Sequence, residues 1–149
     1  MNERNVLIRR LGPDDLPILE RVTPDVFDFE VDARLSAEFL ADPRHHLVVA
    51  LADAHVVGFA SAVHYIQPDK PAELFVNEVG VAPAYQQRGI GRRLLTVLLE
   101  HGKALGCRKA WVATEPTNAA ARALYAAAGG NESPEPFVMV SFELDAQIG

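Results

Sequence analysis

The stretch whose residue types and spacing most clearly indicate a binding or catalytic role is VNEVGVAPAYQQRGIGRRLLTVLL, residues 76–99. An apolar, β-branched run leads through Pro83 into an arginine-flanked Gly-x-Gly and then into a leucine-rich helical pattern. A glycine-rich turn between a strand and a helix presents free N–H groups and the positive end of the helix dipole to one point. We therefore predict that the backbone amides of residues 88–91 hold a phosphate group. A purely structural turn is the alternative.

The amino-acid sequence of this turn does not match two common phosphate-binding motifs. RGIGRRL lacks the Lys-Ser/Thr ending of a P-loop. It also lacks the third glycine of a dinucleotide-binding fingerprint, and it follows the fourth expected strand instead of the first.

The elements that must position this turn alternate along the chain. Hydrophobic periodicity and turn residues predict strands at 5–11, 46–53, 55–66, 72–81, 108–115 and 136–144, and helices at 11–22, 32–42, 88–105 and 117–130. This order indicates a mixed α/β fold around one sheet. The crossovers through the last two helices imply parallel neighbours, and the hairpins are antiparallel.

Composition limits the classes of partner. The chain has 149 residues, of which 49% are hydrophobic and 23% charged, so we expect one domain over residues 1–149. The net charge of −6 disfavours nucleic acid, because phosphate binding needs a basic face. The segment at 25–39 carries five acidic residues against Arg34. It is either a solvated face or an electrostatic funnel for a cation.

Cysteine and histidine usage gives no sign of a metal site. Cys107 is the single cysteine, and the five histidines are scattered without ligand spacing. No apolar run reaches the length of a membrane helix, and the charged N-terminus does not resemble a signal peptide. We therefore expect a soluble, cytoplasmic protein without a metal, and we expect Trp111 in the core.

Two motifs at a fixed distance point to a family. QQRGIG follows VAP at 81–83, and about 25 residues later NAAARALYAAAG places Asn118, Leu124, Tyr125 and Gly129. This combination resembles the GNAT superfamily of acetyl-CoA-dependent N-acetyltransferases, with its Gln/Arg-x-x-Gly-x-Gly/Ala loop and Asn-x-x-Ala-x-x-Leu-Tyr-x-x-x-Gly helix. The likeness covers nearly the whole chain. One departure is Gly130, where the family often has phenylalanine after the glycine.

The resemblance implies a fold and a cofactor. The GNAT fold has a central, mixed, mostly antiparallel twisted sheet of about six to seven strands, with a splayed parallel pair and about four flanking helices. Acetyl-CoA would place its pyrophosphate on the amides of Gln87 to Arg92 and its pantetheine arm along the strand at Val79 and Val81, like an added strand. The expected cofactor-binding residues are Val79, Gly80, Val81, Gln86, Gln87, Arg88, Gly89, Ile90, Gly91, Arg92, Asn118, Ala121 and Tyr125.

Acetyl transfer to an amine needs a base and an acid. An ammonium must first lose a proton, so a carboxylate near the end of the fourth strand serves as general base, directly or through water. Glu78 is the candidate, and a structural strand glutamate is the alternative. The resemblance points Tyr125 at the sulfur as a proton donor; its other interpretation is an aromatic residue buried by an amphipathic helix.

The acceptor follows from a narrower likeness. RRLGPDD, ALYAAAGG and the segment at 47–81 look like the aminoglycoside 3-N-acetyltransferases, which are antibiotic-resistance enzymes with an aspartate where this chain has Glu78. An acidic acceptor side suits a polycation, since each carboxylate can pair with one ammonium. The expected acceptor-side residues are Asp28, Glu30, Asp32, His64, Tyr65, Glu73, Asn77 and Glu78.

Three functions stay open at this point. The first is acetylation of an aminoglycoside or a similar polycation. The second is acetylation of a peptide N-terminus, a lysine, an amino acid or a polyamine by the same fold. The third is an acyl-CoA-binding domain without turnover, although Glu78 and Tyr125 count against it. The expected strand at 136–144 could also pair across a homodimer as an edge.

Overall fold

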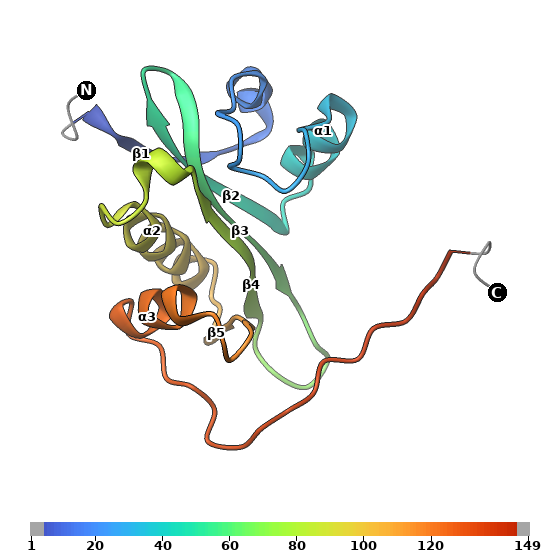
Figure 1. The fold of residues 1–149 in the computed structure, drawn as a ribbon. Helices are drawn as coiled ribbons and strands as arrows, with labels where there is room; N and C mark the ends of the chain where they lie inside the picture. Colours follow the sequence, from blue (N-terminus) through green and yellow to red (C-terminus); the bar gives the residue numbers. More distant parts are fainter. Residues whose placement is uncertain (1–4, 146–149) are drawn as a thin grey trace.

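The computed structural model describes residues 5–145 and consists of one sheet with helices on both faces (Figure 1). The strands are β1 (Leu7–Leu11), β2 (His45–Ala52), β3 (His55–Tyr65), β4 (Glu73–Val81) and β5 (Lys109–Trp111). The α-helices are α1 (Ala33–Ala41), α2 (Ile90–Ala104) and α3 (Ala119–Ala127), and the short 3₁₀ helices are η2 (Pro13–Glu20) and η3 (Pro83–Tyr85). The expected mixed GNAT-type arrangement is confirmed.

The sheet has the spatial order β1-β2-β3-β4-β5. The first four strands pair antiparallel in chain order, and among the strands of residues 5–145 β5 alone runs parallel to its neighbour. This parallel ladder joins just three pairs, from Glu73↔Lys109 to Phe75↔Trp111. β4 and β5 therefore separate beyond Phe75, as the expected splayed pair requires.

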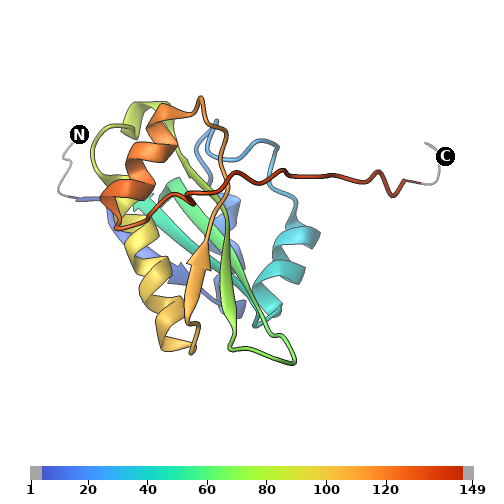
Figure 2. The ribbon, with the colours of Figure 1, turned by 90° about the horizontal axis from the view of Figure 1, so that it is seen from below.

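Two apolar clusters hold the layers together. On one face, buried residues of α2, among them Leu94 and Leu98, pack on β2, β3 and β4. On the other face, Leu19 of η2 and Leu40 of α1 pack around Phe59 of β3. Figure 2 shows α2 and α3 on one side of the sheet and α1 on the other. The helices thus bury both faces of the central strands.

Two strand expectations differ from the structure. The sheet has five strands within residues 5–145, fewer than expected, because residues 136–144 form no ladder with any described strand. Their N–H and C=O groups have no neighbouring strand in the described chain, so an apolar, strand-forming sequence stays extended without becoming a strand. The strand expected at 108–115 also ends early, because β4 diverges from it after Phe75.

The helix expected at 11–22 is a 3₁₀ helix because of Pro17. Proline has no N–H to donate and its ring clashes with the preceding turn of an α-helix. η2 contains Pro17. Its N-cap is Gly12, whose N–H donates to the Asp15 carboxylate at 2.7 Å. The segment therefore packs as a short, tight turn of helix.

A chain of three histidines lies between α2 and the sheet, where the sequence had suggested only scattered histidines. The Arg10 guanidinium donates to His101 Nδ1 at 2.7 Å, since arginine has no acceptor. His101 Nε2–H can then donate to His46 Nδ1 at 3.2 Å, and His46 Nε2–H to His64 Nδ1 at 2.7 Å. Arg10 thereby selects the neutral tautomer of each ring. The histidines come from α2, β2 and β3, so only the fold assembles them.

This chain makes stability depend on pH. Burial, followed by the charges of His101, His64, His45 and Arg10, lowers the pKa of His46 from 6.5 to about 4. Between these two pH values, His46 binds a proton in the unfolded chain but not in the folded chain. The free energy of unfolding should therefore fall as the pH drops from about 6.5 to about 4. The slope contributed by one such group is at most about 1.4 kcal/mol per pH unit.

Urea unfolding of the parent and of His46→Gln at several pH values measures this slope. The substitution removes the titrating ring, so the stability of His46→Gln should depend less steeply on pH in that window. His55→Gln is the matched control, because His55 is exposed and its Nδ1–H donates to the Asp53 carbonyl of its own turn. Equal slopes in all three proteins would contradict the assignment.

Candidate active site

The N-terminus of α2 presents a row of backbone N–H groups without helical acceptors. Gly89 is its N-cap, in the left-handed region with φ 78°, and no side chain caps it. The first intrahelical bond runs from the Arg93 N–H to the Gly89 carbonyl at 3.1 Å, so the amides of residues 89–92 come before the ladder. A Cβ at Gly89 would meet no atom within 4 Å, so the space over this turn is open.

The loop before α2 is held in shape by its own side chains. The Gln86 carboxamide donates to the Val81 carbonyl at 3.0 Å, and Gln87 adopts a positive φ of 62°. The Arg88 guanidinium lies over the Tyr85 ring at 5.4 Å. The first turn of α2 holds no acidic residue and includes Arg92 and Arg93. The helix dipole, the backbone amides, Arg88 and Arg92 favour an anion here, whereas the Arg93 guanidinium donates to the Val6 carbonyl at 3.1 Å.

The gap between β4 and β5 opens beside this loop. Val79, Gly80 and Val81 form ladder pairs with β3 on one side. On the β5 side the ladder has already ended at Phe75, so this edge of β4 has no strand neighbour among residues 5–145. Unpaired backbone groups in a narrow gap can bind an amide-bearing arm like an added strand. Val79, Gly80 and Val81, which we expect to bind pantetheine, therefore lie on an open strand edge that suits an amide-bearing arm.

Helix α3 closes the other side of the gap. Asn118 is its N-cap, and the side-chain oxygen accepts the Ala121 N–H at 3.0 Å. The helix thus uses the oxygen, and the carboxamide nitrogen is the group that could reach a ligand carbonyl. Leu124 lies against Gly91, where an added Cβ would stand 3.5 Å from Leu124 Cδ2. Tyr125 is half-buried, and burial raises its pKa, so the phenol keeps its proton near neutral pH.

Glu78 and Asp28 form a pair of carboxyl groups. Burial raises the pKa of Glu78 above its ordinary value, and the charge of Asp28 and a side-chain hydrogen bond to Asp28 raise it further. The negative charge of Asp28 therefore makes ionisation of Glu78 less favourable. Glu78 lies opposite the buried Ser61 of β3. A base with a raised pKa takes a proton more readily at neutral pH than an ordinary glutamate does.

The segment at 22–31 is pressed against the sheet, and this contact brings Asp28 to Glu78. A Cβ at Gly80 would come within 2.7 Å of the Val26 carbonyl oxygen and 2.9 Å of the Phe59 ring. The Phe27 and Phe59 rings stack with centroids 3.9 Å apart. Val56 receives and donates backbone hydrogen bonds at the start of the segment. Only glycine at position 80 permits this approach.

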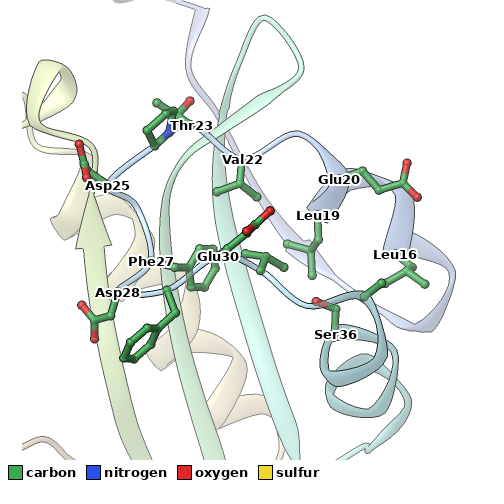
Figure 3. Close-up of a pocket in the computed structure, with 14 residues that line it drawn as sticks. Leu16, Leu19, Glu20, Val22, Thr23, Asp25, Phe27, Asp28, Glu30 and Ser36 are labelled. Carbon is green, nitrogen blue, oxygen red and sulfur yellow. The ribbon is translucent and has the colours of Figure 1, made fainter.

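An acidic cavity of about 520 Å³ lies between η2, the 22–31 segment and the start of α1. Figure 3 shows Asp25 and Asp28 on its β4 side, with Glu20 on the opposite side. Its lining also includes Glu30, Phe27 and Phe29, and none of its 14 described lining residues is Lys, Arg or His. Such a cavity suits a cation with an apolar body. The sequence had offered the acidic side chains, whereas the aromatic walls appear only in the fold.

Several expected acceptor residues lie elsewhere. Asp32 caps α1 by accepting the Leu35 N–H at 2.8 Å and does not line the cavity. Glu73 accepts a hydrogen bond from the Tyr65 hydroxyl at 3.2 Å. Asn77 is the extra residue where the β3–β4 register shifts. His64 belongs to the histidine chain under α2.

Trp111 is not the core residue that we expected. It stays 39% exposed on the short strand β5, which has no strand on its outer side within residues 5–145. Its indole N–H donates to the Tyr65 hydroxyl at 2.8 Å, and its ring lies 4.4 Å from that of Phe75.

Within residues 5–145, no group of three or more His, Cys, Asp or Glu side chains has the arrangement of a metal site. No helix in that range is both long and apolar enough to cross a membrane.

Comparison with known proteins shows a family and a fold. Residues 16–129 match the Acetyltransferase (GNAT) family. A curated relative is the N-alpha-acetyltransferase RimI of Mycobacterium tuberculosis, 39% identical over 90 residues, which are 60% of this chain and 54% of RimI. The match therefore spans about half of that relative's length.

Two solved structures share the fold. The aminoglycoside acetyltransferase meta-AAC0020 from an uncultured soil sample, in complex with sisomicin, has a TM-score of 0.82 at 21% identity, covering 96% of this chain and 99% of that one. The aminoglycoside N-acetyltransferase AAC(6')-Iy, in complex with CoA, has a TM-score of 0.73 at 22% identity, covering 91% and 94%.

The loop geometry predicts the effect of a charge at the α2 N-terminus. Gly89→Asp should weaken coenzyme A binding by at least roughly tenfold, because it adds bulk and like charge beside the amides at 89–92. Isothermal titration with coenzyme A measures the affinity, and circular dichroism reports the fold.

Gly106→Asp is the matched control for this prediction. Gly106 also has a positive φ, of 92°, and open space around a Cβ, but it lies at the other end of α2. Both variants carry similar backbone strain, so only the position of the charge differs. Unchanged affinity in a folded Gly89→Asp protein would remove the phosphate loop from the site.

Proposed function

The chain belongs to the Acetyltransferase (GNAT) family, and on that premise we propose that it transfers the acetyl group of acetyl-CoA to a primary amine of a cationic small molecule. The observation that carries the proposal is the pair of Glu78, on the strand that leads to the phosphate loop, and Asp28, which lines the acidic cavity. A family fold alone would not require either carboxylate. Their placement gives both a proton acceptor and a cation site.

Coenzyme A fits the residues on its proposed path. The amides at 89–92 and Arg88 would hold the pyrophosphate, the open edge of β4 at Val79 and Val81 would pair with the pantetheine amides, and Asn118 would contact the same arm. When bound, acetyl-CoA supplies an activated acetyl thioester. The open edge of β4 would hold that group in one orientation for attack by the amine.

Glu78 is the proposed general base. Its raised pKa makes it a better proton acceptor, while Asp28 offers the second negative charge that an incoming ammonium can pair with. Once the proton passes to Glu78, the amine nitrogen has a free lone pair for attack. Tyr125 is the proposed acid, since its phenol stays protonated and lies on α3 at the wall of the gap. Proton acceptor and proton donor thus come from different elements.

The acceptor class follows from the cavity. Four carboxylates and no basic side chain favour a ligand with several ammonium groups, and the phenylalanines favour a ring framework. An aminoglycoside has both properties, and meta-AAC0020 is an aminoglycoside acetyltransferase of the same fold. Which amine of the aminoglycoside is acetylated stays a prediction. The sequence resembles the aminoglycoside 3-N-acetyltransferases, whereas AAC(6')-Iy, which has the same fold, is a 6'-acetyltransferase by name.

A second candidate acceptor is a peptide N-terminus. The identity of 39% to an N-alpha-acetyltransferase favours it. The two candidates differ in the required charge, because a peptide brings one α-ammonium whereas an aminoglycoside brings several. A non-catalytic acyl-CoA-binding domain would need neither the carboxyl pair nor a protonated Tyr125.

The single, partly buried Cys107 suits the reducing cytoplasm, where we place the protein.

Incubation with acetyl-CoA and a panel of amines tests the proposal directly. The panel contains aminoglycosides with free 3- and 6'-amines, spermidine, free lysine and short peptides, and thiol release is the readout. We expect the highest kcat/KM with an aminoglycoside. Preference for peptides would favour the second candidate, and coenzyme A binding without thiol release for any amine would leave only the binding domain.

The carboxyl pair predicts a specific pH profile. Glu78→Gln keeps shape but takes no proton, so turnover at neutral pH should fall by roughly 10²–10⁴-fold. In the parent, kcat/KM should decline toward acid as Glu78 protonates, at a pH above that of an ordinary glutamate, and this limb should vanish in Glu78→Gln. Part of the loss should recover at alkaline pH, where more amine is neutral.

Tyr125→Phe separates the acid from the base. It removes a donor to the leaving group, and more neutral amine cannot replace that donor, so its loss should persist across the whole pH range. The measurement is kcat/KM against pH for parent, Glu78→Gln and Tyr125→Phe. Parental turnover of Glu78→Gln at neutral pH would make Glu78 a structural residue.

The acidic cavity predicts a salt effect on the acceptor. Asp28→Asn combined with Glu30→Gln should raise the acceptor KM several-fold and flatten its dependence on salt, while the acetyl-CoA KM stays within about twofold. Glu38→Gln, on the exposed part of α1 and outside the cavity lining, is the control of equal chemistry. An acceptor KM and salt response equal to those of the parent would make the 22–31 segment a solvated face.

A further inference from the structure

Arg122 of α3 contacts the chain on both sides of its helix. Its Nε and Nη2 atoms donate to the two carboxylate oxygens of Glu132, each at 2.8 Å. Its Nη1 atom donates to the Pro116 carbonyl at 2.9 Å. A planar guanidinium can make these bonds together because its donors form a fixed fork. We call Arg122, Pro116 and Glu132 the α3 clamp.

α3 itself is a short helix near the surface. It has nine residues, none of them buried, and it lies beside α2 (Figure 1). Helices of fewer than about 12–15 residues are marginal without packing. Leu124, Tyr125 and Ala128 supply that packing, and they are only partly buried against the core under α2. The position of α3 therefore depends on what holds its two ends.

At the entry to α3, the clamp fixes Asn118. The backbone N–H of Arg122 donates to the Asn118 carbonyl at 3.1 Å, while the Arg122 side chain holds the carbonyl of Pro116 just before it. The Asn118 side-chain oxygen caps the helix at the Ala121 N–H. Arg122 thus fixes the turn from which the Asn118 carboxamide nitrogen can reach a ligand.

At the exit from α3, the clamp holds the segment that follows Tyr125. The Gly130 N–H donates to the Tyr125 carbonyl at 2.9 Å, and a Cβ at Gly130 would stand 3.0 Å from that oxygen. Glu132 belongs to the same exit segment and is bound to Arg122. Tyr125 lies one helical turn after Arg122, so the exit contacts and the clamp fix the same part of the helix.

We propose that Arg122 is a positioning residue for acetyl transfer. By clamping the entry and the exit of α3, it sets where Asn118 and Tyr125 lie at the gap between β4 and β5. This role rests on the proposed function, in which the phenol of Tyr125 donates a proton to the leaving group. A proton donor acts only within hydrogen-bond reach, and a misplacement of about 1 Å can cost roughly 100-fold in rate.

The exposure of the clamp separates positioning from stability. The side chains of Arg122 and Glu132 are 45% and 65% exposed, and an exposed ion pair stabilises a whole fold little. The side-chain hydrogen bond from Arg122, and then its charge, lower the pKa of Glu132. Glu132 is therefore ionised at neutral pH, and the clamp is closed there. Breaking it should change the rate of transfer far more than the melting temperature.

Kinetics with acetyl-CoA test the role of Arg122. Arg122→Gln should lower kcat/KM by at least about tenfold, while the acceptor KM stays within about twofold and the melting temperature within about 4 °C. Glu132→Gln should act in the same direction, and its exposed site keeps the test valid if Arg122→Gln does not fold. Parental kinetics in both folded variants would overturn the proposal, whereas an inactive parent would overturn the proposed acetyl transfer instead.

Arg44→Gln is the matched control. Arg44 donates to both carboxylate oxygens of Asp42, from Nε at 3.3 Å and from Nη2 at 3.1 Å, but this exposed pair lies between α1 and β2. Its loss should leave kcat and both KM values within about twofold of the parent. A loss in Arg44→Gln equal to that in Arg122→Gln would show a general effect of charge and would refute positioning.

A double-mutant cycle with Tyr125→Phe shows whether Arg122 acts through the phenol. In the Tyr125→Phe background there is no phenol to position, so Arg122→Gln should cost at least about threefold less in kcat than it does in the parent. An equal cost in both backgrounds would refute positioning of Tyr125.

Hydrogen exchange and coenzyme A binding test the clamp without turnover. The amides of residues 119–128 should exchange at least about fivefold faster in Arg122→Gln and Glu132→Gln than in the parent and in Arg44→Gln. Isothermal titration should show weaker binding of coenzyme A by the same two variants, since Asn118 is no longer fixed. Unchanged exchange across α3 would overturn the clamp, whatever the outcome of the acetyl-transfer assays.

Discussion

The parallel ladder between β4 and β5 stops after three residue pairs, and the candidate site depends on that stop. Had the strands stayed paired as far as Val81, the backbone of Val79 and Val81 would be saturated and no arm of a ligand could lie there. Since they separate, β4 keeps an open edge that leads to the N-terminus of α2. The same divergence shortens β5 and leaves Trp111 at the surface.

A second constraint is the closeness of the 22–31 segment to β4. The position of the Val26 carbonyl over Gly80 leaves no room for any side chain there. Stacking of Phe27 on Phe59 fixes the segment, and Asp28 then meets Glu78. The pKa of Glu78 is therefore raised first by its burial and further by Asp28, which the packing of this segment brings close.

The buried polar side chains have hydrogen-bond partners inside the fold. Among the described residues, no buried side-chain nitrogen or oxygen lacks a hydrogen bond. The three histidines under α2 satisfy one another in series because Arg10 fixes the direction of donation. The outer edge of β5 and the extended C-terminal arm, residues 136–144, have no strand partner within residues 5–145.

The sequence by itself determined the local features. Periodicity and turn residues predicted α2, α3 and strands β1 to β4, because these elements depend on neighbours along the chain. The two motifs also indicated the family. Tertiary structure decided the length of β5, the unpaired arm, the meeting of Asp28 with Glu78 and the histidine chain. Each of these joins residues distant in sequence, and no local pattern encodes which strand edge or side chain a group will meet.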